Sequence, residues 1–287
     1  MQPLLADEHD DSRVTTSETG AKSVVILARG LGTRMRREDT SAELNDTQAA
    51  AADSGVKGMI PIGRPFLDFV LTAIADAGFK RVCIVIGPEH DKVRDYYMTT
   101  APPSRVSVMF AIQEKPLGTA NAVLAAEPFA DGEPFIVLNS DNYYPADALA
   151  RLRVTTPPAL IGFARSALIE SGNVAADRVE RFGALEFDEN GILESITPRK
   201  HASRPSSDEV YASMNCWLFD SKIFDACRAV PVSPRGEFEL TRAVQMAVDS
   251  LGMKFTVVPM NAAVLDLSTR ADIASVKNRL SAAVISY

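Results

Sequence analysis

Residues 24–34 read Val-Val-Ile-Leu-Ala-Arg-Gly-Leu-Gly-Thr-Arg, an apolar run that breaks into a turn containing two glycines. The run is typical of a buried parallel strand. The turn is typical of an anion-binding loop, because glycine lets backbone N–H groups approach a ligand that a Cβ would exclude. Arg34 at its end offers a bidentate positive charge. An ordinary tight turn followed by a surface arginine explains the same residues, so this stretch alone predicts a strand and leaves its ligand open.

Strand and helix patterns alternate after this first strand. Strands are expected at 81–87, 106–112, 135–138 and 159–164, with helices at 65–77, 118–126 and 145–152 between them. Such alternation is typical of an α/β fold with a doubly wound, mostly parallel mixed sheet, in which ligands bind at the carboxyl ends of the strands. We therefore predict a Rossmann-like architecture.

The pattern changes at Phe182. Two short strands, 183–188 and 192–197, flank Glu189-Asn190-Gly191, a hairpin signal, and indicate a small β-rich subregion. Further elements are expected at 214–219 (a strand), 237–251 and 269–280 (helices).

The domain organisation follows from length and composition. Residues 1–21 are acidic at several positions and contain no apolar signal-peptide core, so they are interpreted as a disordered tail. The remainder, 22–287, is expected to form one domain. Within it we distinguish an N-terminal half of about 22–165 and a C-terminal half of about 166–287.

Charge and apolar content restrict the function classes. The formal net charge is −7 and no basic stripe occurs, which argues against nucleic acid or an anionic membrane as the main partner. A few cations in a cleft can still hold a phosphorylated ligand. No apolar stretch approaches the roughly 20 residues that span a bilayer. The three cysteines are far apart in sequence, which favours reduced thiols and a cytoplasmic protein. Assembly into a homo-oligomer is left open.

Several short motifs occur in an order that resembles the sugar-1-phosphate nucleotidylyltransferases, from about residue 22 to the C-terminus. Residues 27–34 match that family's Leu-x-x-Gly-x-Gly-Thr-Arg signature, and Lys57-Gly58-Met59-Ile60-Pro61 resembles its Lys-x-Met-x-Pro segment. The later landmarks are Gln113 with Leu117-Gly118-Thr119-Ala120, Asn139-Ser140-Asp141-Asn142, Gly183, Asn215, Gly236-Glu237 and Asp266 before Ser268-Thr269. An ordered set of motifs is more specific than any one of them.

The resemblance implies a GT-A-like nucleotidyltransferase fold. It also implies transfer of a nucleoside monophosphate from a nucleoside triphosphate to a sugar 1-phosphate, with Mg²⁺ as cofactor. The N-terminal half would bind the nucleotide and the C-terminal half the sugar phosphate, with Arg34 and Lys57 as catalytic residues. The implied nucleotide-binding residues are Ala28, Gly30, Gly32, Thr33, Gln113, Gly118 and Thr119. The implied sugar-phosphate-binding residues are Asn142, Gly183, Glu186, Arg199, Lys200, Asn215 and Glu237.

Gln113 bears on the choice of base. A side-chain amide donates and accepts at once, which suits the imide edge of uracil or thymine. UTP or dTTP is therefore favoured, while a purine stays open. Glu186 lies in an alternating strand, and a solvated position explains it as well as a sugar contact does.

Two aspartates are the candidate Mg²⁺ ligands. Asp141 follows strand 135–138, where a carboxylate faces the ligand crevice of a doubly wound sheet, although an Asx turn also explains it. Asp266 lies within an apolar strand, and a buried carboxylate needs a cation or hydrogen-bond donors. Both positions match the magnesium-binding positions of the resembling family, and Mg²⁺ typically uses one or two carboxylates together with substrate phosphates.

The expected reaction needs no general base, because its nucleophile is an oxygen of a phosphate group. This group is already ionised near neutral pH, since its second pKa is about 6. The protein must position two anionic substrates and neutralise their charge. The demand therefore falls on cations such as Arg34 and Lys57, and the three histidines receive no role.

Two departures from the family pattern keep a second function open. Arg29 stands where a small residue usually precedes the first loop glycine. The family's Glu-Lys-Pro motif, whose lysine holds the sugar phosphate, is replaced near Thr197-Pro198, where the following Arg199 or Lys200 could supply the charge. The alternative is a non-catalytic nucleotide-sugar sensor or regulatory subunit of the same fold.

Residues 36–56 are acidic and rich in alanine. They could form a mobile lid over the phosphates or a solvated helical insertion. The insertion is favoured, because acidic sequence repels phosphates while alanine-rich sequence readily forms exposed helix.

Overall fold

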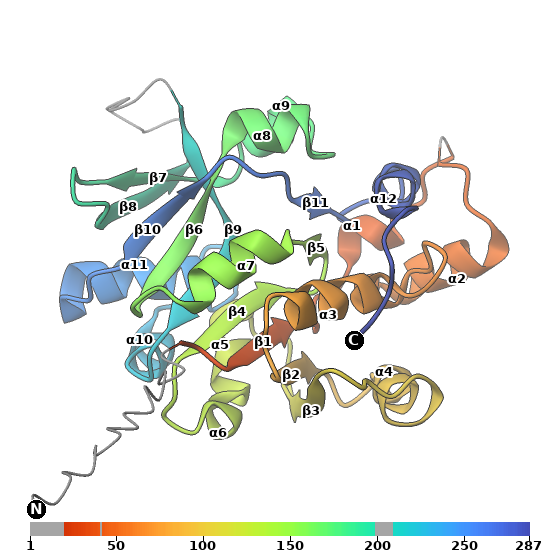
Figure 1. The fold of residues 1–287 in the computed structure, drawn as a ribbon, viewed down its shortest axis with the longest axis horizontal. Helices are drawn as coiled ribbons and strands as arrows, with labels where there is room; N and C mark the ends of the chain where they lie inside the picture. Colours follow the sequence, from red (N-terminus) through yellow and green to blue (C-terminus); the bar gives the residue numbers. More distant parts are fainter. Residues whose placement is uncertain (1–19, 41, 199–208) are drawn as a thin grey trace, which may run out of the picture.

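A nine-stranded sheet forms the centre of the computed structural model (Figure 1). The structure describes residues 20–40, 42–198 and 209–287. Most of the predicted tail, residues 1–19, lies outside this range. The main strand order is β10 (Thr256–Met260), β6 (Ala159–Ala164), β9 (Tyr211–Phe219), β4 (Phe135–Asn139), β1 (Ser23–Leu27), β2 (Arg81–Ile86) and β3 (Ser107–Ile112). The hairpin of β7 (Gly183–Phe187) and β8 (Leu193–Pro198) joins this sheet beside β9.

The strand directions confirm the predicted mostly parallel mixed sheet. Strand β1 is parallel to both β2 and β4, β2 is parallel to β3, and β6 is parallel to β10. Strand β9 is antiparallel to β4 and to β6, so the other six strands of the main path share one direction. Both predicted halves of the chain therefore contribute strands to the same sheet.

The side chains of β1 alternate between two apolar cores, one on each face of the sheet. Val24 and Ile26 belong to the core beneath α3 (Phe66–Asp76) and α7 (Ala146–Arg153). Val25 and Leu27 belong to the opposite core. The helices on that face are α5 (Thr119–Ala125), α10 (Ile223–Ala229) and α11 (Leu240–Leu251). Figure 1 shows the two helical layers. The run is continuously apolar because both of its faces are buried.

A separate two-stranded sheet forms just after the carboxyl end of the central strand β4. Strand β5 (Asn142–Tyr143) pairs antiparallel with β11 (Leu265–Asp266), and Asn142 lies opposite Asp266. The remaining helices are α1 (Thr33–Arg36), α2 (Asp46–Ser54), α4 (Asp91–Asp95), α6 (Glu127–Ala130), α8 (Arg165–Glu170), α9 (Ala176–Val179) and α12 (Asp272–Leu280), with a 3₁₀ turn at Lys57–Met59.

The acidic segment forms a helix, α2, that is more firmly attached than a solvated insertion would be. Asn45 and Gln48 form a reciprocal capping box at its N-terminus. The Gln48 amide also donates to the carbonyl of Pro61, at 2.9 Å. From the far end of the sequence, Arg270 donates to the carbonyl of Arg37, at 3.1 Å, and pairs with Asp53. These contacts hold α2 beside the loop that follows β1.

The structure departs from the expected elements at two informative places. Strand β10 was not predicted, because Pro259 interrupts its pattern, and the strand lies at the edge of the sheet, where proline is tolerated. The predicted helix 237–251 begins only at Leu240, because the preceding residues pair with the loop before α5.

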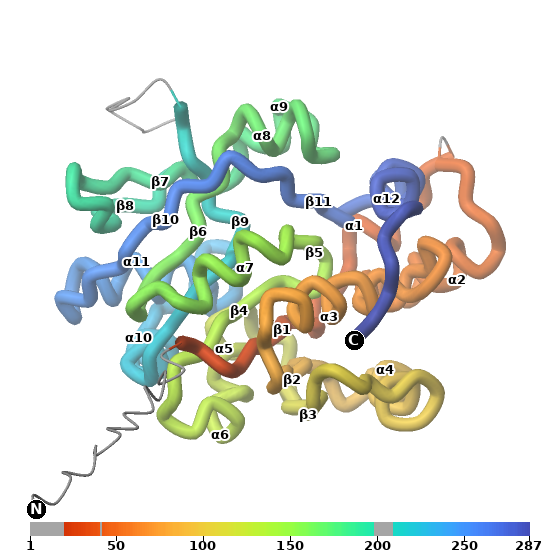
Figure 2. The backbone as a smooth tube through the Cα atoms, viewed as in Figure 1, coloured from red at the N-terminus to blue at the C-terminus, as the bar shows by residue number. Residues whose placement is uncertain are grey.

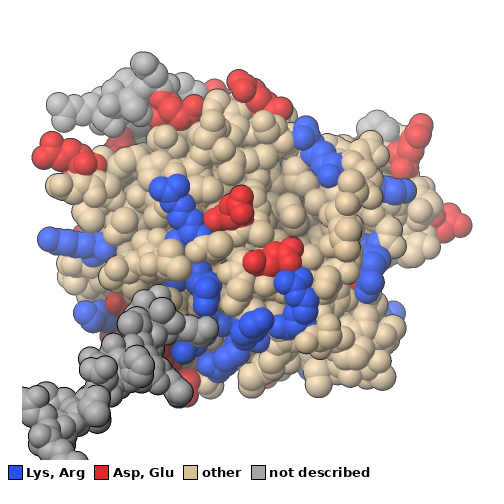
Figure 3. All heavy atoms as spheres, viewed as in Figure 1, with Lys and Arg blue, Asp and Glu red and all other residues tan. Residues whose placement is uncertain are grey.

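The outer features of the molecule agree with its composition. None of the described helices is long and apolar enough to cross a membrane. Acidic and basic side chains are interspersed on the face in Figure 3. The three cysteines are buried and form no disulfide.

Figure 2 shows the C-terminal segment beside α3, where the backbone N–H of Ser286 donates to Thr72 at 3.1 Å.

Candidate active site

The carboxyl ends of β1 and β4 place two loops side by side. Leu27, the last residue of β1, lies opposite Asn139, the last residue of β4. The glycine loop, which we define as residues 28–33, therefore leaves the sheet next to residues 140–141. The backbone N–H of Ser140 donates to the Leu27 carbonyl at 3.2 Å and joins the two loops. This is the edge at which the strand pattern predicted a ligand.

The two loop glycines meet different demands. Gly32 has φ +60°, and a Cβ there would lie 2.3 Å from the carbonyl oxygen of Gly55, so this position requires glycine for the fold itself. At Gly30 a Cβ would meet nothing within 4 Å. The space beside Gly30 is therefore available to a ligand, as the anion-loop interpretation requires.

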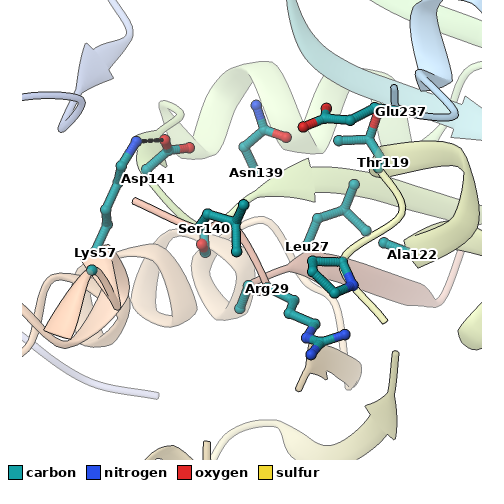
Figure 4. Close-up of a pocket in the computed structure, with 15 residues that line it drawn as sticks. Leu27, Arg29, Lys57, Thr119, Ala122, Asn139, Ser140, Asp141 and Glu237 are labelled. Atoms are coloured by element: carbon teal, nitrogen blue, oxygen red, sulfur yellow. Dashed lines mark hydrogen bonds and ion pairs between the residues drawn. The ribbon is translucent and has the colours of Figure 1, made fainter. Parts of the chain in front are cut away.

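The glycine loop lines a cavity of about 210 Å³, which we call the glycine-loop cavity. Figure 4 shows the Lys57–Asp141 pair on one side of it and Thr119 with Glu237 on another. Its walls are Leu27, Ala28, Arg29, Gly30, Leu31, Gly55, Lys57, Pro116, Gly118, Thr119, Ala122, Asn139, Ser140, Asp141 and Glu237. Four of the seven expected nucleotide-binding residues are among them: Ala28, Gly30, Gly118 and Thr119. Gly32 and Thr33 lie beyond the wall, at the start of α1.

Glu237, expected to bind the sugar phosphate, lines the glycine-loop cavity. Two segments distant in sequence join here: the Phe238 N–H donates to the Leu117 carbonyl, and the Ala120 N–H donates to the Phe238 carbonyl, both at 2.8 Å. The Leu240 N–H donates to the Thr119 hydroxyl, also at 2.8 Å. In Figure 4 the Glu237 carboxylate extends toward Asn139.

Gln113 is buried directly behind this cavity. Its side-chain nitrogen donates to the Gly118 carbonyl at 3.0 Å and to Asn121 Oδ1 at 2.9 Å. Both amide hydrogens are therefore committed to protein acceptors. The side chain is only 3% exposed and is not among the residues that line the cavity.

Arg29, the departure from the family pattern, is held by an ion pair. Its Nη2 lies 3.1 Å from a carboxylate oxygen of Glu89, and its Nη1 donates to the carbonyl of Gln113. Its side chain is 7% exposed, against 53% for Glu89. Hydrogen bonds from the backbone and from Arg29 lower the pKa of Glu89, which keeps the carboxylate charged opposite the guanidinium.

A second cavity, of about 160 Å³, adjoins the first, and we call it the two-aspartate cavity. It is lined by Arg34, Asn139, Asp141, Asn142, Phe182, Ser213, Met214, Asn215, Asp266 and Ser268. The pairing of β5 with β11 creates it, because this pairing sets Asp266 opposite Asn142, one residue after Asp141. Asn139 and Asp141 line both cavities and form the wall between them.

Asp266 is buried and almost fully hydrogen-bonded. Its Oδ1 accepts from Ser268 at 2.9 Å and from Asn142 at 3.2 Å, and its Oδ2 pairs with Arg178. Burial and the nearby Asp141 charge raise the pKa of Asp266, whereas Arg178 acts in the opposite direction. The carboxylate thus has the cation and donors that the sequence required of it, and the cation is an arginine.

The two catalytic candidates, Lys57 and Arg34, differ in their surroundings. The Lys57 ammonium lies 2.7 Å from Asp141 Oδ2, with 14% of its side chain exposed. Arg34 is exposed in the two-aspartate cavity and has no hydrogen-bond or ion-pair partner among the described residues. Lys57 is therefore fixed at the wall between the cavities, and Arg34 offers an uncommitted positive charge beside them.

The remaining sugar-side candidates divide into three groups. Asn142 and Asn215 line the two-aspartate cavity, and Asn215 adopts a left-handed conformation with φ +56°. Gly183 and Glu186 lie on β7 and are not among the residues lining either cavity. The Glu186 Oε2 accepts from Ser195 at 2.6 Å. Arg199 and Lys200 fall outside the described residues.

Two arginines that the sequence analysis missed hold the site together. Arg178, on α9, bridges Asp266 and Asp272. Arg270, after β11, anchors the end of α1 through the carbonyls of Met35 and Arg37, each at 3.1 Å. Each partner is tens to hundreds of residues away in the chain, so local patterns carried no signal for these contacts. The indirect signal for Arg178 was Asp266 itself, a carboxylate within an apolar strand that needs a cation or donors.

Comparison with known proteins places the chain in a family. A family profile described as nucleotidyl transferase matches residues 52–280. Bifunctional protein GlmU of Methanococcus vannielii is 27% identical over 88% of this chain and 54% of its own length. Glucose-1-phosphate thymidylyltransferase of Streptomyces griseus is 29% identical over 79% of this chain and 57% of its own. The chain thus spans about half the length of these relatives.

A solved structure has the same fold. The structure of UDP-glucose pyrophosphorylase complexed with UDP-glucose superposes with a TM-score of 0.68 over 91% of this chain and 98% of that one, at 17% identity. The family match covers well over half of the chain. The chain therefore belongs to the nucleotidyl transferase family, in agreement with its resemblance to the sugar-1-phosphate nucleotidylyltransferases.

Proposed function

We propose that the chain transfers a nucleoside monophosphate from a nucleoside triphosphate to a sugar 1-phosphate, releasing pyrophosphate. UTP or dTTP is the favoured donor. The single observation that carries the proposal is the wall shared by the two cavities, which consists of Asn139 and Asp141. Two ligands bound on either side of this wall would meet at the Lys57–Asp141 pair. The name of the thymidylyltransferase relative supports the same substrate class.

The attacking group is a phosphate oxygen of the sugar 1-phosphate, which displaces pyrophosphate at the α-phosphorus. This oxygen is already ionised near neutral pH, since its second pKa is about 6, so the protein holds no proton during the step. Lys57 at the shared wall would neutralise charge on the α-phosphate. Arg34, which has no hydrogen-bond or ion-pair partner among the residues that the structure describes, would grip phosphate oxygens with two N–H groups.

The donor set beside these cations fits Mg²⁺. The two-aspartate cavity offers the carboxylates of Asp141 and Asp266 together with amide and hydroxyl oxygens, and Mg²⁺ prefers oxygen ligands. Mg²⁺ typically keeps several waters and uses only one or two carboxylates together with substrate phosphates, so two aspartates are a sufficient protein contribution. Asp141 and Asp266 would hold the ion, which supplies charge neutralisation between the phosphates.

The sugar phosphate would bind in the two-aspartate cavity and beside it. Asn215 and Asn142 line the two-aspartate cavity and offer amides suited to hydroxyl groups. We keep Gly183 and Glu186 as proposed contacts of the wider site, together with Arg199 or Lys200 as the phosphate-binding cation. Glu237, at the glycine-loop cavity, is closer to the expected nucleotide than to the sugar.

A pyrophosphate-release screen tests the proposal. Purified protein with Mg²⁺ is incubated with each of four nucleoside triphosphates and several sugar 1-phosphates. Release that requires both substrates, with UTP or dTTP giving the highest rate, is the expected result. Nucleotide binding without turnover for every pair would instead favour the non-catalytic sensor, which the presence of Arg29 in the loop keeps open.

A further inference from the structure

We propose that Arg29 selects nucleotides whose base carries a keto oxygen at C4 of a pyrimidine or at C6 of a purine, as in uracil, thymine and guanine. Cytosine and adenine, which carry an amino group at the corresponding position, would be disfavoured. The inference rests on the proposed function, because it takes the glycine-loop cavity as the nucleotide site. It assigns a specificity-determining role to the residue that departs most clearly from the family pattern.

The layout of the cavity places the base near Arg29. Lys57 marks the phosphate end, since triphosphate oxygens need a cation. Other walls are Leu27, Pro116 and Ala122, and apolar walls of this kind suit a planar base. In Figure 4 the Arg29 guanidinium points away from the Lys57–Asp141 pair. A nucleotide that spans the cavity from Lys57 therefore brings its base, rather than its phosphates, toward Arg29.

The Arg29 guanidinium is a fixed group that can only donate. It donates to the Gln113 carbonyl and pairs with Glu89, which fixes its position, and 7% of its side chain is exposed. Its four hydrogen bonds to these partners leave at least one N–H for a ligand. A keto oxygen can accept this hydrogen, whereas an amino group would oppose N–H to N–H and leave both groups without a partner.

Gln113 supplies the complementary half of the pattern. Its nitrogen must face the Gly118 carbonyl, which can only accept, and this contact fixes the orientation of the amide. With both hydrogens committed, the amide can present only Oε1, which accepts, and it does so from behind the residues that line the cavity. A donor beside an acceptor matches a keto oxygen beside an imide N–H, which uracil, thymine and guanine present. Cytosine and adenine present the reverse order.

Equilibrium binding of nucleotides tests the inference without relying on turnover. Dissociation constants are measured with Mg²⁺ for UTP against CTP and for GTP against ATP, so that each comparison keeps ring size constant. We expect the keto base of the tighter-binding pair to bind at least about tenfold more strongly, as one hydrogen bond to a charged donor allows. Arg29→Ala should reduce this ratio to within about threefold, mainly by weakening the keto nucleotide.

Two further substitutions separate the donor chemistry from simple loss of side-chain volume. Arg29→Lys keeps a group that only donates and should retain part of the preference. Arg29→Gln can also accept, so it should gain affinity for the amino base. Arg94→Ala is the matched control, because Arg94 forms an exposed pair with Asp91 on the neighbouring helix α4 and should leave the ratio unchanged. Melting temperatures confirm that each variant is folded.

The outcomes distinguish this inference from the proposed function. Equal binding of keto and amino nucleotides by the unaltered protein, or an unchanged ratio in Arg29→Ala and Arg29→Gln, would overturn the role of Arg29 even if turnover is observed. Selective binding that depends on Arg29 without turnover would support the inference and contradict the catalytic proposal. Absence of nucleotide binding would contradict both.

Discussion

The glycine-loop cavity and the two-aspartate cavity share a wall but are built in different ways. The first depends largely on backbone geometry, with Gly32 pressed against Gly55 and residues 117–120 hydrogen-bonded to 238–240. The second depends on side-chain charges brought together from distant parts of the chain, such as Asp266 and Arg178. The comparison teaches that the glycine-loop cavity is formed by a loop held through its backbone, while the two-aspartate cavity is held by ionic contacts.

Substitutions at the wall shared by the two cavities should affect catalysis most, because the two substrates are expected to meet there. Asp141→Asn should lower turnover by several orders of magnitude, because it removes charge stabilisation from the transition state. Its melting temperature should remain close to that of the unaltered protein, since the lost pair with Lys57 is partly exposed. Steady-state kinetics and thermal denaturation provide the two measurements. Asp147→Asn, an exposed carboxylate on α7, is the control, and near-normal activity in Asp141→Asn would return Asp141 to a turn-capping role.

Arg34 follows the glycine loop in sequence and lines the two-aspartate cavity. Arg34→Ala should cost about 3–4 kcal/mol of transition-state stabilisation, or about two to three decades in rate. Arg34→Lys should recover only part of this, since an ammonium cannot reproduce the planar guanidinium fork. The ratio kcat/KM is measured for both variants and for the exposed neighbour Arg37→Ala. Kinetics like those of the unaltered protein in Arg34→Ala would remove Arg34 from the catalytic residues.

Lys57 should show a mixed effect, because it lies where the two ligands would meet. Lys57→Ala is expected to raise the KM for the nucleotide and to lower kcat. The combined loss should be about ten- to a hundredfold, since a charged hydrogen bond contributes about 1.5–3 kcal/mol. Varying each substrate separately gives the two parameters. A change confined to the KM of the sugar phosphate would place Lys57 with the other ligand.

The smallest effect is expected at Arg178, which pairs with Asp266 and Asp272. Arg178→Gln leaves Asp266 buried without its cation, so the free energy of unfolding should fall by about 2 kcal/mol, less than for a fully buried pair because Arg178 is partly exposed. Mg²⁺ should raise the melting temperature of this variant more than that of the unaltered protein, because arginine no longer occupies the carboxylate. Arg181→Gln, an exposed arginine paired with Asp177, is the control. An equal response to Mg²⁺ in both proteins would argue against Asp266 as a metal ligand.

The same contrast explains which parts of the molecule could be predicted from the sequence. Strands such as β1 and β4 were found because two-sided burial produces uninterrupted apolar runs, and the loops after them follow directly. The start of α11 was misplaced because the Leu240 N–H donates to the Thr119 hydroxyl, a long-range contact that no local pattern near residue 237 reveals.

The same contrast between local patterns and long-range contacts applies to the residues of the candidate site. Asp141 and Gly30 could be selected because each follows a strand closely, and both line the glycine-loop cavity. The Arg178 bridge could not be selected, since it joins α9 to β11 and depends on the folded topology. Glu237 was assigned to the sugar phosphate by the resemblance, and its position in the wall of the glycine-loop cavity, set by the pairing of Phe238 with Leu117, could not be predicted locally.

The central claim is that two substrates meet at the wall formed by Asn139 and Asp141. A crystal structure of the protein with bound UDP-glucose, the product expected from UTP and glucose 1-phosphate, tests this most directly. The account predicts the base in the glycine-loop cavity beside Arg29, the sugar in the two-aspartate cavity, and the diphosphate crossing between them at Lys57. A nucleotide sugar confined to one cavity, or bound elsewhere on the chain, would contradict it.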